Sequence, residues 1–150
     1  MSYKLFVDTN VYIDFLTQRG KEWKNAELIF ELAENKQITI YTSSSSFINI
    51  MYILAAAKMD RKQIVHATTA ILTYTTLINP DNKTCIRALE SGFTDTEDAI
   101  QYYTALEYTG IDYFITTNTK DFKKALTGLP ILTPTAFMQL RNKSHVLGAQ

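Results

Sequence analysis

Short apolar segments alternate with longer segments of helical periodicity along the whole chain, and this alternation is the strongest constraint on the fold. The short segments have the composition or the flanking turn residues of strands, and they comprise residues 3–7, 38–41, 76–79, 112–117 and 131–132. Strands that are separated by helices need crossover connections, which make the sheet mainly parallel and place helices on both of its faces. The sequence therefore predicts an α/β fold built as a three-layer α/β/α sandwich.

Helices are predicted between these strands. A first helix follows the cap-type residues 8–10 and closes at Arg19, the serines at 43–46 begin another, and a last helix begins at Pro134. The other predicted helices span residues 23–35, 60–75, 82–91, 94–110 and 121–126. We expect one domain over residues 1–150, with an irregular tail at about 144–150.

Composition narrows the class of protein further. Fifteen Lys and Arg balance fifteen Asp and Glu, so the chain is not a strongly basic nucleic-acid clamp. The single Cys85 cannot form an internal disulfide, and the longest apolar run, residues 50–57, is too short to cross a bilayer. Without a recognisable signal peptide, a cytoplasmic protein without a membrane segment is expected.

The charges are unevenly distributed. No Lys or Arg lies between Arg87 and Lys120, whereas that interval contains six acidic residues. These are Glu90, Asp95, Glu97, Asp98, Glu107 and Asp112. The pattern fits a local acidic site with basic surroundings, although the counts alone favour scattered charges on a solvated surface.

Three acids are placed to meet at one edge of the sheet. Asp8 directly follows the first strand, Asp121 follows the strand at 112–117, and Asp98 lies in the first turn of its helix. Ligands of open α/β sheets bind beyond the carboxyl ends of the strands. A cluster of carboxylates there favours Mg²⁺ or Mn²⁺ and phosphoryl chemistry, whereas the lone cysteine and two distant histidines do not fit zinc.

Each acid also has a structural explanation. Asp8 can cap the first helix, and Thr94 with Glu97 has the spacing of a capping box. Asp95 is an alternative cap for that same helix, and Asp14 is expected on the solvent side of its own helix. The sequence alone leaves these alternatives open for the individual residues.

Other motif classes are absent. The five glycines are isolated, so no nucleotide-binding glycine loop is present, and the serine run contains no GxSxG motif. Several aromatic residues have the spacing of core positions, although they could also stack on nucleobases. They are Tyr102, Tyr103, Tyr108, Phe114 and Phe122.

Three segments together resemble the PIN-domain nucleases, particularly the VapC-like toxins. They are VDTNVYIDFL at residues 7–16, DTEDAIQYYTALEYTGIDYFITTNTKDF at 95–122 and LPILTPTAF at 129–137. The resemblance implies an α/β/α sandwich that cleaves RNA with one or two Mg²⁺ or Mn²⁺ ions. It also implies a type II toxin that forms a homodimer and is neutralised by an antitoxin protein.

Carried over by position, the resemblance assigns roles to particular residues. Asp8 and Asp98 match metal ligands, and Asp121 matches an acid that binds the metal directly or through water. Glu97 is a further candidate ligand. Polar supporting positions are matched by Thr9, Asn10 and either Thr116 or Thr117.

Two positions depart from the family pattern. Asn49 stands where many members carry Glu, and Asn118 stands where many carry Asp. Both keep an oxygen ligand but remove a charge, which predicts weaker metal binding. The alternative function is therefore a catalytically weakened RNA-binding or scaffold protein with the same fold. Beside Asp121, the expected contacts with RNA phosphates are Lys120, Lys123 and Lys124.

Overall fold

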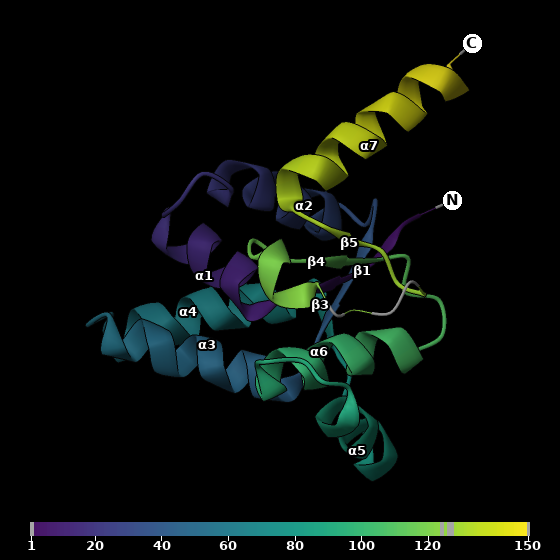
Figure 1. The fold of residues 1–150 in the computed structure, drawn as a ribbon. Coiled ribbons are helices and arrows are strands. Elements are labelled where there is room, and N and C mark those ends of the chain that lie inside the picture. Colours follow the sequence, from purple (N-terminus) through teal and green to yellow (C-terminus); the bar gives the residue numbers. More distant parts are fainter. Residues whose placement is uncertain (1, 124, 126–127, 150) are drawn as a thin grey trace.

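The computed structural model describes residues 2–123, 125 and 128–149, in which five parallel strands form one sheet between layers of helices (Figure 1). The strands are β1 (Lys4–Val7), β2 (Thr39–Thr42), β3 (Thr75–Leu77), β4 (Tyr113–Ile115) and β5 (Ile131–Leu132). Their order in the sheet is β3-β2-β1-β4-β5, and Phe6 of the central β1 pairs with Tyr41 and Phe114 of its two neighbours. The predicted parallel sheet is confirmed.

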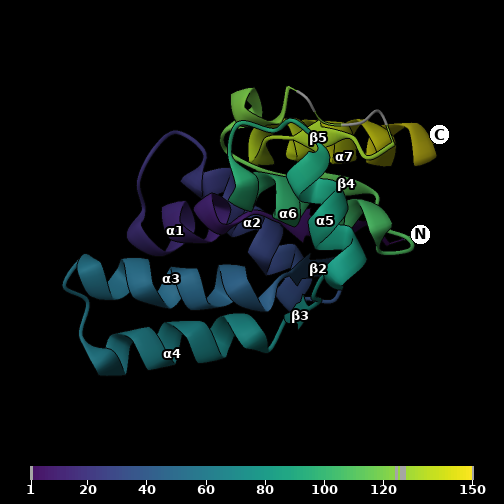
Figure 2. The same ribbon diagram turned by 60° about the horizontal axis from the view of Figure 1, so that its bottom comes forward.

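The helices surround this sheet in the order that the sequence predicted. They are α1 (Thr9–Thr17), α2 (Trp23–Glu34), α3 (Ser44–Ala56), α4 (Arg61–Leu72), α5 (Asn82–Glu90), α6 (Thr96–Glu107), the 3-10 turn η1 (Thr119–Phe122) and α7 (Pro134–Gly148). Turning the molecule brings α3 and α4 forward as an antiparallel pair (Figure 2). Ser43 caps α3 by accepting a hydrogen bond from the Ser46 backbone, so the serine run does begin a helix.

Successive side chains of β1 point to opposite faces of the sheet, so the core is divided between two helical layers. Leu5 and Val7 pack with residues of α1, α2, α3 and α7, whereas Phe6 faces α5 and α6. The Phe6 and Phe114 rings stack with their centroids 5.4 Å apart. Burial of each such side chain contributes about 1.5–3 kcal/mol, so the strands are anchored from both faces. The three-layer α/β/α fold is thereby confirmed.

Most of the aromatic residues that were considered for base stacking belong to this core. Tyr102 and Phe114 are completely buried, and Tyr103 and Phe122 are at most 9% exposed. Tyr108 is 41% exposed at the end of α6, where its ring lies 5.1 Å from that of Tyr41. The core interpretation is confirmed for the four buried rings.

Three local predictions differ from the structure. Helix α7 continues to Gly148 instead of giving way to an irregular tail at 144, and it projects from the body of the molecule (Figure 1). The helix expected at residues 121–126 is the turn η1, and residues 124, 126 and 127 lie outside the described part of the chain. Asp14 is buried, not on the solvent side, because Arg19 folds over it with an Nε–Oδ1 distance of 2.8 Å.

In the part of the chain that the structure describes, no helix combines the length and apolar character that a bilayer span requires. Because all five strands run in the same direction, the residues that follow β1, β2 and β4 lie at one edge of the sheet. The candidate site lies at this edge.

Candidate active site

Asp8 is held by backbone and side-chain hydrogen bonds where β1 passes into α1. Its backbone N–H donates to the Ile115 carbonyl at 2.9 Å, which ties it to the end of β4. Its Oδ1 accepts from the Thr9 backbone N–H at 2.8 Å, and its Oδ2 accepts from the Thr116 hydroxyl at 2.9 Å. The expected capping role is therefore confirmed. With 3% of its surface exposed, the carboxylate is also nearly removed from water.

The first turn of α6 carries the second group of acids. Asp95 is the cap, and its Oδ1 accepts from the backbone N–H groups of Glu97 at 2.9 Å and Asp98 at 3.1 Å. Of the two caps that the sequence left open, Asp95 is confirmed, and the alternative capping box of Thr94 and Glu97 does not form because Asp95 satisfies those N–H groups. The Glu97 side chain instead reaches α3, where Asn49 Nδ2 donates to its Oε1 at 3.1 Å.

Asp121 joins the site from η1. Its exposed carboxylate accepts a hydrogen bond from the Asn118 amide, and the Asn118 backbone N–H donates to the Thr116 hydroxyl at 3.2 Å. Since Thr116 donates to Asp8 in turn, one threonine connects the end of β4 to two of the predicted acids. Thr116, rather than Thr117, therefore occupies the supporting position.

The acids act on one another electrostatically. Burial is the main cause that raises the pKa of Asp8 to about 6, and the charges of Glu97 and Asp121 add to it while the bonds from Thr116 and Thr9 oppose it. The pKa of Asp98 is raised to about 7, first by burial and then by the charges of Asp8, Asp95, Asp121 and Glu97. The fold thus concentrates acidic groups at this edge of the sheet, where each negative charge raises the pKa of Asp98 further.

The arrangement has the chemistry of a hard-cation site without being a complete one. Its donors are carboxylate oxygens, which suit Mg²⁺ and Mn²⁺, and two of the carboxyl groups have raised pKa values that a cation would lower. Within the described residues, however, no group of three or more His, Cys, Asp or Glu side chains is placed to hold a metal ion together. Asp8, Asp98 and Asp121 are brought near one another but not onto one point.

Comparison with known proteins identifies the family. The sequence matches the family model for the PIN domain over residues 4–120. This chain belongs to the PIN-domain family. A search of curated proteins finds no match.

Two solved structures share the fold of this PIN domain. VapBC2 from Rickettsia felis, bound to a DNA fragment from its promoter, superposes with a TM-score of 0.63 at 18% identity over 87% of this chain and 98% of the other. PAE2754 from Pyrobaculum aerophilum superposes with a TM-score of 0.59 at 14% identity over 93% and 90%.

A buried network of hydrogen bonds joins α1, α3 and α6 beneath the acids of the PIN-domain site, and most of its residues were not predicted. The Thr9 hydroxyl donates to Ser46 Oγ at 2.8 Å, Gln101 also donates to Ser46, and Ser43 Oγ donates to Gln101 Oε1 at 3.2 Å. Only Thr9 was expected among these residues. Gln101 lies three residues after Asp98, on the same face of α6, so helical spacing was the available signal.

Two predicted supporting residues stand apart from the acids of the PIN domain. Asn10 is exposed at the start of α1, and Thr117 is half-buried after β4. Among the described residues, neither side chain forms a hydrogen bond with Asp8, Asp98 or Asp121. Asn49 and Asn118 do contact acids, through Glu97 and Asp121 respectively.

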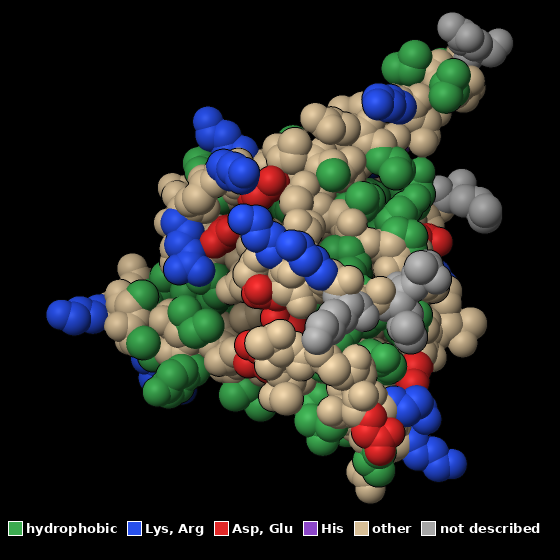
Figure 3. Space-filling model, in the orientation of Figure 1, with side chains coloured by type: hydrophobic (Ala, Val, Ile, Leu, Met, Phe, Trp, Pro, Cys, Tyr) green, Lys and Arg blue, Asp and Glu red, His purple; other side chains and the backbone are tan. Residues whose placement is uncertain are grey.

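A hollow of about 410 Å³ opens beside the acids of this PIN domain, and we call it the lysine hollow. It is lined by Phe93, Thr94, Asp95, Lys120, Asp121 and Lys123. Figure 3 shows acidic side chains in a recess near the centre of the same view as Figure 1, with Lys and Arg side chains directly above them. Lys120 and Lys123 therefore line the same hollow as Asp121, and Lys124 lies outside the described residues.

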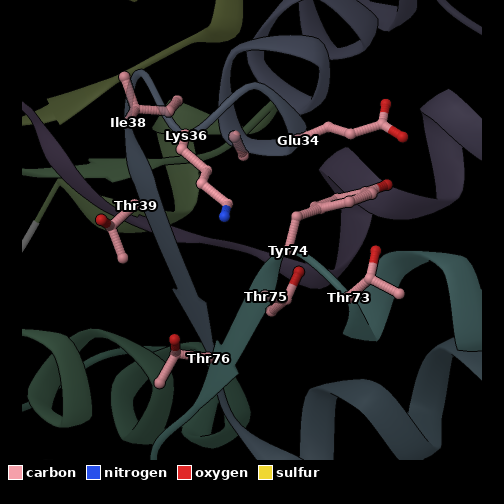
Figure 4. A pocket seen from close by; sticks show the side chains of 9 residues that line it. Glu34, Lys36, Ile38, Thr39, Thr73, Tyr74, Thr75 and Thr76 are labelled. Carbon is pink, nitrogen blue, oxygen red and sulfur yellow. The ribbon is translucent and has the colours of Figure 1, made fainter.

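Another hollow of the PIN domain, of about 270 Å³, lies at the amino ends of β2 and β3 (Figure 4). Thr39 and Thr75, the first residues of those strands, both line it, so it is at the opposite edge of the sheet from the acids. Burial, followed by the charge of Glu34, raises the pKa of its Tyr74 to about 12. This tyrosine stays protonated at neutral pH and takes no part in the acidic site.

Proposed function

We propose that this PIN domain is an endoribonuclease that hydrolyses RNA phosphodiester bonds with water and requires Mg²⁺ or Mn²⁺. The observation that carries the proposal is the placement of Asp8 and Asp98 at the carboxyl edge of the sheet, where burial first and neighbouring carboxylates second raise their pKa values to about 6 and about 7. Carboxyl groups with pKa values perturbed in this way cluster at functional sites. Membership of the PIN-domain family supports the same activity.

In this proposal Asp8, Asp98 and Asp121 hold the ion, and Glu97 adds negative charge beside them. Mg²⁺ is generally bound by one or two protein carboxylates, with water and substrate phosphate as the other ligands, so a complete cage of protein ligands is not required. When bound, the ion neutralises charge on the phosphate and activates water. Thr116 holds the Asp8 carboxylate in place, and Asn118 does the same for Asp121.

The flanking lysines are proposed to bind the RNA backbone. Lys120 and Lys123 line the lysine hollow together with Asp121, so a phosphate held there lies next to the acids. Binding of phosphates by lysine releases counterions and weakens as salt rises. The chain as a whole has zero formal charge, and this local arrangement, not the net charge, is what attracts RNA.

We also propose that the protein acts in the cytoplasm as the toxin of a type II toxin–antitoxin pair and forms a homodimer. The fold that it shares with VapBC2 supports this biological role. Exposed apolar side chains on α5, Ile86 at 54% and Leu89 at 58%, offer a surface that a partner would cover. Co-purification with the product of a neighbouring gene, followed by mass measurement of the isolated protein, tests both partners.

The activity is tested with purified wild type, Asp8→Asn and Asp98→Asn. We expect the wild type to cut RNA with Mg²⁺ or Mn²⁺ and both variants to lose cleavage while remaining folded. Mapping of cleavage sites in total cellular RNA after induction of wild type or Asp8→Asn then identifies the target. Full cleavage by either variant, or in excess chelator, contradicts the proposal.

A second candidate function is an RNA-binding scaffold with weakened catalysis. Its specific support is that Asn118 donates a hydrogen bond to Asp121 and Asn49 donates one to Glu97, so two amides occupy acid oxygens. Titration calorimetry with Mn²⁺ beside a cleavage assay separates the two functions. Metal binding without turnover of any RNA supports the scaffold, and cleavage supports the nuclease.

A further inference from the structure

Helix α3 and the start of α6 form a second hollow beside the acids, of about 410 Å³, which we call the tyrosine hollow. It is lined by Ser45, Ile48, Asn49, Tyr52 and Glu97. Ile48 and Tyr52 are four residues apart, so they lie on one face of α3. They are 62% and 74% exposed, so together they present an apolar face to solvent.

This hollow adjoins the proposed reaction site. Asn49 Nδ2 donates to Glu97 Oε1 at 3.1 Å, so the wall of the hollow is bonded to the residue that precedes Asp98. The charge of Glu97 contributes to the raised pKa of both Asp8 and Asp98, which shows how close it lies to them. The first turn of α6 therefore contributes to two hollows, since Asp95 lines the lysine hollow and Glu97 lines the tyrosine hollow.

We propose that the tyrosine hollow is a nucleobase subsite, in which the Tyr52 ring stacks on a base next to the phosphate that is cut. Ile48 packs against the same base, and Ser45 and Asn49 place polar groups at its edge. This inference rests on the proposed function. It assigns the lysine hollow to the phosphate backbone and the tyrosine hollow to a base, so the RNA strand crosses the start of α6 between them.

The lining of the hollow favours a base over other occupants. It contains no Lys or Arg, and the carboxylate of Glu97 repels a phosphate. Its volume falls in the range of about 300–1,000 Å³ that is usual for small-molecule sites.

The proposal also predicts a preference for single-stranded RNA. A base can lie on the Tyr52 ring only when it is unstacked from its neighbours, which is the usual state in loops and single strands. Stacking on an aromatic side chain contributes about 1–3 kcal/mol per base, which corresponds to about 5- to 150-fold in affinity. Because every base has an aromatic face, the contribution tolerates changes of sequence.

The test measures RNA binding by fluorescence anisotropy in an Asp8→Asn background, in which the RNA is not cut. The probes are a labelled single-stranded RNA oligonucleotide of mixed sequence and the same strand with abasic positions. Tyr52→Ala is compared with Tyr52→Phe, and Val65→Ala is the control because Val65 is an exposed apolar residue of α4 that does not line the hollow. The oligomeric state of each variant, from its mass in solution, and its melting temperature are measured in parallel.

We expect Tyr52→Ala to weaken binding of the intact RNA at least 5-fold, while Tyr52→Phe and Val65→Ala retain the affinity of the parent. Abasic RNA should bind the parent weakly, and Tyr52→Ala should weaken it no further. Unchanged affinity of Tyr52→Ala, or an equal loss with abasic RNA, overturns the inference. The inference is also overturned if the parent is a dimer and Tyr52→Ala is a monomer that binds RNA as tightly as the parent, because the hollow is then covered by a second copy of the chain. Failure of the parent to bind any RNA overturns the proposed function as well.

Discussion

Replacement of Asp8 by Asn is expected to stabilise the metal-free protein above about pH 6 while it removes RNA cleavage. The fold buries the Asp8 carboxyl group almost completely and raises its pKa to about 6. Its pKa in the unfolded chain is about 4. The charged form is therefore less favourable in the folded protein than in the unfolded chain, and the neutral amide avoids this cost.

The magnitude and the pH range follow from these two pKa values. A change in the pKa of Asp8 from about 4 in the unfolded chain to about 6 in the folded protein lowers the free energy of unfolding by about 3 kcal/mol when the carboxyl group is charged. The folded state binds this proton more tightly, so stability is highest below about pH 4, falls as pH rises through the interval between the two pKa values, and is constant above it. The advantage of Asp8→Asn is thus near zero at about pH 4 and approaches about 3 kcal/mol at about pH 8.

The side chain of Asn fits the same hydrogen bonds. Its oxygen can accept from the Thr9 backbone N–H, and its amide can donate to the Thr116 hydroxyl, which is itself able to accept. The Thr116 hydroxyl proton, which donates to Asp8 in the wild type, and the second N–H of the amide then have no acceptor, and this loss reduces the gain in stability below about 3 kcal/mol. For a domain of this size, about 3 kcal/mol raises the melting temperature by about 6–12 °C, and this is an upper value because the buried group relaxes.

The assay is thermal unfolding followed by circular dichroism in excess chelator across this pH range. Glu31→Gln is the matched control, because Glu31 is an exposed acid of α2 and its replacement removes the same charge. Added Mg²⁺ should then raise the melting temperature of the wild type and leave that of Asp8→Asn unchanged, which reduces the difference between the two melting temperatures. A variant that melts below the wild type at about pH 8, or a difference that does not change with pH, refutes the reasoning.

Three further outcomes are expected. Thr116→Val removes the hydroxyl that stabilises the charged form of its neighbouring acid, so calorimetric binding of Mn²⁺ should require a higher pH than in the wild type. Lys120→Ala combined with Lys123→Ala should reduce the slope of log affinity for RNA against log salt by about 2, and an unchanged slope contradicts their proposed role. Asp95→Ala removes the cap of α6 and should cost about 0.5–2 kcal/mol of stability in urea unfolding, together with a loss of cleavage as the first turn frays.

The fold was largely predictable because its signals are local. Periodicity identified every strand that the structure contains in the described residues, and parallel pairing followed from the helices between the strands. Errors occurred at ends, such as the continuation of α7 to Gly148, where no core contact sets the limit. Asp14 was misplaced because its partner, Arg19, lies beyond the end of α1 and is not on the same helix.

The site was predictable only in part. Asp8 was found from its place after β1, and Asp98 from its place in the first turn of α6. The network of Ser43, Ser46 and Gln101 was missed because it depends on how α3 approaches α6 across the edge of the sheet. The spacing of a run of serines does not indicate whether the hydroxyl groups face water or are buried beneath a site.

The sequence by itself determined the order in which strands and helices follow one another along the chain, the parallel direction of the strands, and the residues that follow each strand. These properties depend on the spacing of apolar residues and on chain direction, which are written along the chain. Only the tertiary structure decided that Asp8 is buried, that Asn49 holds Glu97, and that lysine and tyrosine hollows lie beside one helix turn. The physical reason is that burial, pKa and contact depend on distances between segments far apart in sequence, and strand order and register set those distances.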